Sequence, residues 1–216
     1  MKSQELYSLI TLENFKAVLG IDDREDKISS FCLVTATYTI EQYCKRRLIK
    51  RQHNDYLSCN GDYIFPLKEY PLCRIYSVHA ANEQRAKNGD VLFGSDTIVS
   101  RKLYYSIPDE GIYEDIPSSL VLRPPLSRSS ERLMLRVKYA AGYSTGIGME
   151  YDRKGVKPDL ASACLELAAW NMGRYKARRI GMTGSVRGGG KDGEHFEMSM
   201  PMQVRQLLEP YKRKVI

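Results

Sequence analysis

The chain has 216 residues, of which 43% are hydrophobic and 27% charged, with a formal net charge of +7. This balance supports one hydrophobic core with room for a smaller second unit, and it excludes an intrinsically disordered chain. No run of about 18 apolar residues occurs, and Glu5, Glu13 and Asn14 interrupt the first segment, so we expect no membrane span, no membrane partner and no secretory signal.

The positive charge is concentrated at the end of the sequence. Residues 151–216 carry 13 Lys and Arg against 7 Asp and Glu, whereas residues 51–150 carry 12 of each. Clusters at 174–179 and 211–214 favour a polyanionic neighbour, either nucleic acid or an acidic protein face, because like charges raise the local potential over a Debye length of about 10 Å. The alternative is that each cluster complements the dipole at a helix end.

Two helices are predicted in the first 50 residues. Thr11 precedes an amphipathic run that stops at Gly20, which predicts a short helix with a hydroxyl N-cap and a glycine C-cap. A second helix is predicted to follow at once, capped by Asp22 and Asp23 and ending near Arg47. Spacings of three and four predict its apolar stripe: Ile28, Phe31, Cys32, Thr35, Tyr38, Thr39 and Tyr43.

From about residue 51 the pattern becomes that of short strands. Residues 56–59 and 63–65 flank Asn60-Gly61, which accepts the positive φ values of a type I′ turn, so a hairpin is predicted here. Further strands are predicted at Arg74–Ala80, Thr97–Val99, Leu103–Ser106, Ser119–Leu122 and Arg132–Ala140. The last alternates between apolar and polar residues, which indicates a sheet with one side exposed to water.

Helical spacing returns at Pro158, a residue suited to a first helical position, and continues to Tyr175. Six glycines then fall within residues 181–193, a composition typical of a flexible segment. A final helix is predicted from Pro201 through Leu208. The alanines at 161, 163, 168 and 169 leave room for another helix to approach closely.

Two short motifs resemble catalytic sites and fail on context. Residues 142–146 fit GxSxG around Ser144, but a hydrolase elbow needs a helix directly after the serine, and a loop is predicted there. Gly190-Lys191 suggests a phosphate loop, yet Ser185 replaces the first glycine and Asp192 stands where Ser or Thr should bind magnesium. We therefore predict no enzymatic activity.

Metal and disulfide chemistry is not predicted either. The three histidines are far apart, and the acidic pairs at 109–110 and 114–115 lack the ligand spacing of a calcium loop. The five cysteines are widely spaced without CxxC pairs, which is typical of buried or surface thiols in a reducing compartment. No cofactor is expected.

Taken in order, several segments carry a family resemblance: 12–21, 40–47, the 60–61 turn with Phe65-Pro66-Leu67 and Tyr70-Pro71, 137–143, 158–170 and 201–211. Together they resemble the head–tail connector (head-completion adaptor) proteins of tailed phages, over nearly the whole chain. The central β-rich region is longer than in compact helical members, so its additional strands are expected to form a projecting lobe. The implied fold is α+β, with a small helical core formed by residues 1–50 and 156–216 and a β-rich insertion at 51–155.

The resemblance implies a structural adaptor of the virion neck, assembled in the host cytoplasm. Copies of the chain would form a ring, usually twelve-fold, that binds the portal protein, presents a surface to the next neck or tail component and extends the DNA channel, with weak, non-specific contact to the packaged DNA. Portal contacts are predicted at Arg205, Leu208, Tyr211, Lys212, Arg213 and Lys214. Side chains facing the channel or an acidic partner are predicted at Arg174, Lys176, Arg178 and Arg179. A flexible loop between subunits is predicted at Gly181, Gly184, Val186, Gly188, Gly189 and Gly190.

A different class of function stays open on the sequence alone. The basic C-terminal third would also suit a free-standing nucleic-acid-binding protein, which predicts duplex binding by the monomer with a steep dependence on salt. The connector hypothesis instead predicts weak DNA affinity and assembly with the portal.

Overall fold

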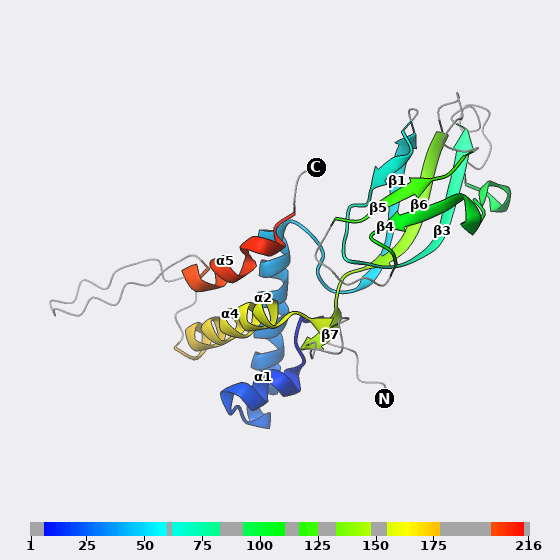
Figure 1. Cartoon of the computed structure of the whole chain (residues 1–216). Coiled ribbons are helices and arrows are strands. Elements are labelled where there is room, and N and C mark those ends of the chain that lie inside the picture. Colours follow the sequence, from blue (N-terminus) through cyan, green and yellow to red (C-terminus); the bar gives the residue numbers. More distant parts are fainter. Residues whose placement is uncertain are drawn as a thin grey trace. The chain divides into compact units, whose positions relative to one another are not determined.

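The computed structural model describes residues 7–59, 62–82, 93–110, 117–124, 133–147, 155–177 and 200–213. The chain separates into two compact units, one formed by Met1–Lys45 with Thr145–Arg213 and the other by Arg46–Ser144 (Figure 1). The first is helical and the second is built from antiparallel strands, so the predicted α+β class is confirmed. The predicted boundaries at 50/51 and 155/156 stay a prediction.

The helical unit joins both ends of the chain. Its elements are α1 (Leu12–Leu19), a 3-10 turn (Asp23–Glu25), α2 (Asp26–Cys44), α4 (Pro158–Lys176), α5 (Met202–Leu208), a 3-10 turn (Glu209–Tyr211), and the short pair β7 (Ser144–Ile147) and β8 (Gly155–Val156). Helix α2 packs against α4 and α1, and α5 packs against α4 and α2. Residues from the first and last thirds of the sequence therefore share one core.

Local signals set both ends of α1 and the start of α4 as predicted. The Thr11 hydroxyl accepts the Asn14 N–H at 3.2 Å, and Gly20 closes α1 in the left-handed region at φ 63°. Pro158 occupies the first turn of α4. Asp22 and Asp23 do not cap α2, because residues 23–25 form a 3-10 turn before it. Helix α2 also ends at Cys44 rather than near Arg47.

The predicted apolar stripe of α2 is wrong in its details. Phe31 is 56% exposed and Tyr38 47% exposed, whereas the buried side of the helix carries Ser29, Cys32, Leu33, Ala36, Thr37, Ile40, Glu41 and Cys44. The reason is the close approach of α4, which needs small side chains: the Thr37 hydroxyl lies 3.8 Å from the Cys164 sulfur. Both faces of α2 satisfy helical spacing, so spacing alone could not distinguish them.

The β-rich unit contains two three-stranded antiparallel sheets around a common core. One sheet has the order β1 (Arg51–Cys59), β6 (Leu133–Ala141), β3 (Leu72–Asn82), and the other has β2 (Ile64–Pro66), β5 (Ser119–Leu122), β4 (Tyr104–Ile107). The core between them includes Phe65, Leu120, Leu135, Val137 and Tyr139, each at most 4% exposed. Alternation places these side chains on the inner sides of the sheets.

The hairpin predicted around residues 60–61 is wrong in its pairing. Strand β1 pairs with β6 over nine residue pairs from Arg51–Ala141 to Cys59–Leu133, and β2 pairs with β5 instead. The turn residues themselves lie outside the described residues. A nine-pair ladder with a strand about eighty residues away outcompetes a three-residue local pairing, because hydrogen bonds and cross-strand contacts increase with ladder length.

The predicted strand at 97–99 is also corrected. Ser95–Thr97 is a 3-10 turn, and beyond it Ile98 makes an isolated bridge to His79. The predicted strand at 119–122 coincides with β5, and β6 lies within one residue of its prediction.

Candidate functional site

The C-terminal segment, for which portal contacts are predicted, is tied firmly to the helical unit. Val204 and Leu208 are fully buried and Tyr211 is 2% exposed. The Tyr211 hydroxyl donates to Asp159 Oδ1 at 2.5 Å, and the Arg213 N–H donates to the Cys44 carbonyl at 2.8 Å. Leu208 and Tyr211 therefore hold α5 in place rather than forming exposed surface.

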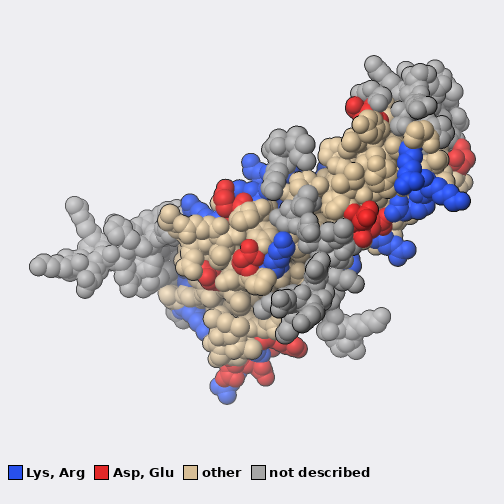
Figure 2. Space-filling view, in the orientation of Figure 1, with Lys and Arg blue, Asp and Glu red and all other residues tan. Residues whose placement is uncertain are grey.

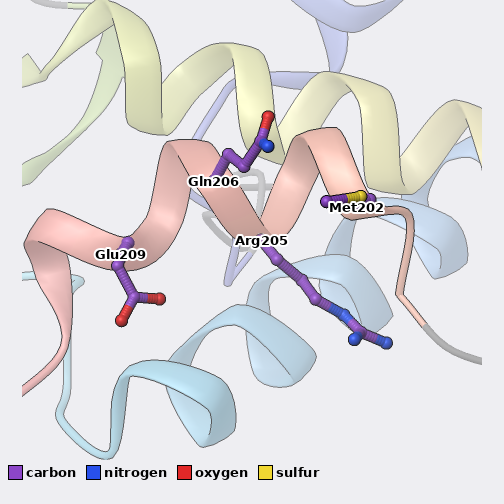
Figure 3. Close-up of a pocket in the computed structure, with 4 residues that line it drawn as sticks. All are labelled: Met202, Arg205, Gln206 and Glu209. Atoms are coloured by element: carbon purple, nitrogen blue, oxygen red, sulfur yellow. The ribbon is translucent and has the colours of Figure 1, made fainter.

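The outward side of α5 lines an open pocket of about 450 Å³. Its lining residues are Met202, Arg205, Gln206 and Glu209, whose spacing of three, four and seven places them on one face of the helix. Figure 3 shows the Arg205 and Glu209 side chains extending to the side of α5 away from α4, and Gln206 extending toward α4. Met202 is 67% exposed.

Charge at this surface is partly compensated. Lys212 Nζ lies 2.8 Å from Glu209 Oε2 and 4.4 Å from the centre of the Tyr43 ring, and the Tyr43 hydroxyl donates to the same carboxylate at 3.2 Å. The hydrogen bond from Lys212 lowers the pKa of Glu209, and the same bond raises the pKa of Lys212. Among the described residues Arg205 has no ion-pair partner. Its positive charge is therefore the one at this pocket that no described carboxylate neutralises.

The basic end of α4 is engaged in contacts within the helical unit. The Arg174 guanidinium lies 4.6 Å from the centre of the Trp170 ring. Lys176 Nζ lies 2.7 Å from Glu25 Oε2, and the Tyr175 ring lies 5.5 Å from the Phe31 ring. Arg178, Arg179, the glycine loop with Gly181, Gly184, Val186, Gly188, Gly189 and Gly190, and the terminal Lys214 all lie outside the described residues.

The serine motif does not form a nucleophile elbow. Gly142 ends β6 with φ 108°, and Ser144 begins strand β7 rather than a helix. The Gly190-Lys191 motif lies outside the described residues.

Of the acidic pairs noted in the sequence, Glu110 makes structural contacts. Glu110 accepts the Ile75 N–H at 2.9 Å and pairs with Arg101, while Glu114 and Asp115 lie outside the described residues. Among the residues that the structure describes, no group of His, Cys, Asp and Glu is arranged to hold a metal ion, and no helix is both long and apolar enough to cross a membrane.

Positive charge is not confined to the C-terminal third. Figure 2 shows Lys and Arg side chains gathered on the β-rich unit as well as on the helical one. The β1-β6-β3 sheet carries Arg74 on β3 and Arg136 and Lys138 on β6, a group that the sequence analysis did not single out. The alternation in β6 predicted that Arg136 and Lys138 face solvent. It could not predict that β1 and β3 would lie beside β6 and bring Arg74 to the same side.

No family model matches the chain, and no curated protein sequence matches it. Solved structures do share its fold. A chain in the neck of an empty gene transfer agent particle, computed with C6 symmetry, has a TM-score of 0.58 and 18% identity, covering 96% of this chain and 91% of the other.

Two further neighbours agree with the first. A chain in the virion of a native gene transfer agent particle has a TM-score of 0.57, and one in the neck of the native particle, computed with C12 symmetry, has a TM-score of 0.53; each is 17% identical with the same coverage. At these identities the similarity establishes the fold, which extends over both units.

Proposed function

We propose that the chain is a structural subunit of a phage-like neck, an adaptor that joins the capsid portal to the tail and extends the DNA channel. The observation that carries this proposal is the shared fold over 96% of this chain with a chain of a gene transfer agent neck. Because the match covers 96% of this chain, the β-rich unit belongs to the likeness as well as the helical core. The role is structural rather than catalytic.

A ring of identical subunits is part of the proposal. Two of the neighbours come from necks computed with C6 and C12 symmetry. Closing a ring needs two different surfaces on each copy that fit one another. We propose twelve copies, assembled in the host cytoplasm and retained in the virion neck.

The portal-facing surface is proposed to be the outward side of α5. Burial of Leu208 and Tyr211 anchors the helix, so its exposed side chains are presented on a rigid support. Met202 offers apolar area, and Arg205 offers a charge that no described neighbour neutralises. Lys212 borders this surface with its charge shared with Glu209.

The test is assembly with the portal. Purified chain is mixed with portal rings, and the particles are examined by electron microscopy for an added ring and its symmetry. We expect Arg205→Glu to weaken portal binding at least tenfold, and Lys27→Glu, the same charge change at an exposed position of α2, to leave it within about twofold. A chain that stays monomeric and ignores portal rings would rule out the neck role.

A further inference from the structure

The β1-β6-β3 sheet has an outer side with an unusual charge distribution. Asp55 is the one acidic residue in its three strands, and it is 4% exposed and points inward, accepting the buried Tyr139 hydroxyl at 2.8 Å. The outer side thus carries cations without a carboxylate from these strands. Its outward positions are Gln52, Asn54, Tyr56, Ser58, Arg74, Tyr76, Ser77, His79, Met134, Arg136 and Lys138.

Strand register brings these residues into rows across the sheet. Lys138 of β6 stands between Asn54 of β1 and Ser77 of β3. Two positions further along β6, Arg136 stands between Tyr56 and His79. Strands lie about 4.8 Å apart and alternate residues about 7 Å apart, so the cationic positions lie near one another on one side of the sheet.

A β-bulge adds an aromatic residue to the cluster. The register of β3 against β6 shifts between Ile75 and Ser77, which makes Tyr76 the extra residue. Its ring is 45% exposed, and the Arg74 guanidinium lies 5.9 Å from the ring centre, so both side chains occupy the outer side. Tyr56, 58% exposed, is the matching aromatic residue on β1.

Arg136 is held in position by its neighbours. Its guanidinium lies 5.0 Å from the centre of the Phe93 ring and donates to His79 Nε2 at 3.2 Å. The Thr97 hydroxyl donates to the Gly94 carbonyl at 2.7 Å, so it accepts from His79 Nδ1 at 3.1 Å. That arrangement places the imidazole proton on Nδ1 and leaves Nε2 to accept from Arg136. Arg74 and Lys138 are exposed and have no ion-pair partner among the described residues.

The chemistry of this side suits a phosphate backbone better than a protein. Protein interfaces have an apolar centre, whereas the large apolar residue on this side is the half-buried Phe93, which packs 5.9 Å from the Tyr56 ring and 5.0 Å from the Arg136 guanidinium. The exposed aromatic residues of the three strands are Tyr56 and Tyr76, both with a hydroxyl donor. Arg, Lys, Tyr, Asn, Gln and Ser are the side chains that contact phosphate oxygens in protein–DNA complexes. Several cations on one side of the sheet, rather than converging on one point, match a polyanion.

We propose that the outer side of the β1-β6-β3 sheet binds the phosphate backbone of duplex DNA through Arg74, Arg136 and Lys138, without reading base sequence. The inference rests on the proposed neck function for its biological setting, since that function brings packaged DNA past the subunit. It assigns DNA contact to the β-rich unit instead of the C-terminal residues expected from the charge count. The binding itself is a property of the isolated chain.

The experiment measures fluorescence anisotropy of a labelled duplex titrated with the full chain over a series of salt concentrations. The test variant is Arg74→Gln with Lys138→Gln. A first control, Lys102→Gln with Arg123→Gln, removes the same charge from exposed residues of the same unit outside this sheet. A second control, Arg205→Gln with Lys212→Gln, removes it from the C-terminal segment.

We expect the test variant to lose at least tenfold in affinity and its salt slope to fall by about two, because each phosphate contact contributes about 0.9 to that slope. Both controls should stay within about twofold of the wild type. Lys138→Gln alone, at an exposed position, should give part of the loss with an unchanged circular dichroism spectrum.

Several outcomes would overturn the inference. These are no duplex binding by the wild-type chain at low salt, equal losses in the test variant and the first control, or a larger loss in the C-terminal control. Tighter binding to a single strand with the same number of phosphates would overturn the duplex assignment, since it would indicate base stacking on Tyr56 and Tyr76. Failure of ring assembly with intact DNA binding would reject the neck function and leave this surface standing.

Discussion

Replacing Tyr139 with Phe removes one buried hydroxyl and keeps the ring. The substitution therefore measures how much the hydrogen bonds of that hydroxyl stabilise the β-rich unit. The hydroxyl donates to Asp55 Oδ2 at 2.8 Å and accepts the Glu69 N–H at 3.1 Å. Asp55 Oδ2 also accepts the Lys68 N–H at 2.9 Å, so the segment after β2 is tied to both β1 and β6. Burial, and then the nearby Asp55 charge, raise the pKa of Tyr139, so the hydroxyl keeps its proton at any working pH.

The magnitude follows from what the substitution leaves unpaired. A hydrogen bond to a charged group contributes about 1.5–3 kcal/mol, and loss of the acceptor of the part-buried Glu69 N–H adds up to about 1 kcal/mol. We therefore expect Tyr139→Phe to lower the free energy of unfolding by about 3 kcal/mol. With a urea slope of about 1.5 kcal/mol per molar, the unfolding midpoint should fall by ~2 M.

Urea unfolding followed by far-ultraviolet circular dichroism measures this shift. The matched control is Tyr63→Phe, the same atom removed from a side chain that is 56% exposed, for which we expect a change within about 0.5 kcal/mol. A Tyr139→Phe midpoint indistinguishable from that control would refute the reasoning, because it would mean that the Asp55 carboxylate needs no buried donor from β6.

Three further predictions concern backbone, pH and thiols. Gly142→Ala should be strongly destabilising, because φ is 108° and a Cβ would lie 2.7 Å from the Leu48 carbonyl oxygen. Gly20→Ala, where a Cβ meets open space at φ 63°, should lower the free energy of unfolding by about 1 kcal/mol. Equal urea midpoints for the two variants would contradict this prediction. Burial and the Arg136 charge lower the pKa of His79, so the contribution of the neutral imidazole to stability is present above about pH 6.5 and is lost as the pH falls through the folded-state pKa. His79→Gln should therefore reduce the difference between the urea midpoints at about pH 7.5 and about pH 5. An undiminished difference would count against a neutral imidazole in the folded chain. Burial raises the pKa of the Cys32 thiol to about 11 and that of the Cys164 thiol to about 12. Iodoacetamide at neutral pH should therefore modify the half-buried Cys73 first, measured by peptide mass spectrometry. Comparable labelling of Cys164 in the folded chain would contradict its burial.

The basic residues show why the candidate site was only partly predictable. Charge counting indicated the C-terminal third, and Arg205 does lie there with no ion-pair partner among the described residues. Lys176 and Lys212, however, pair with Glu25 and Glu209. Glu25 lies 151 positions before Lys176, so no local window contains both. A count of charges along the chain cannot distinguish a cation that is free from one that is already paired.

The sequence by itself determined the elements whose signals are local. Thr11 and Gly20 delimit α1, Pro158 begins α4, and the alternation in β6 assigns its inner and outer sides. Helix capping, the fixed φ of the proline ring and the two-residue period of a strand all act within a few positions. Only the tertiary structure decided that β1 pairs with β6, which side of α2 is buried, and that Arg74, Arg136 and Lys138 share one sheet side. Those outcomes depend on which distant segments pack best together, and packing energy is a property of the pair of segments rather than of either one alone.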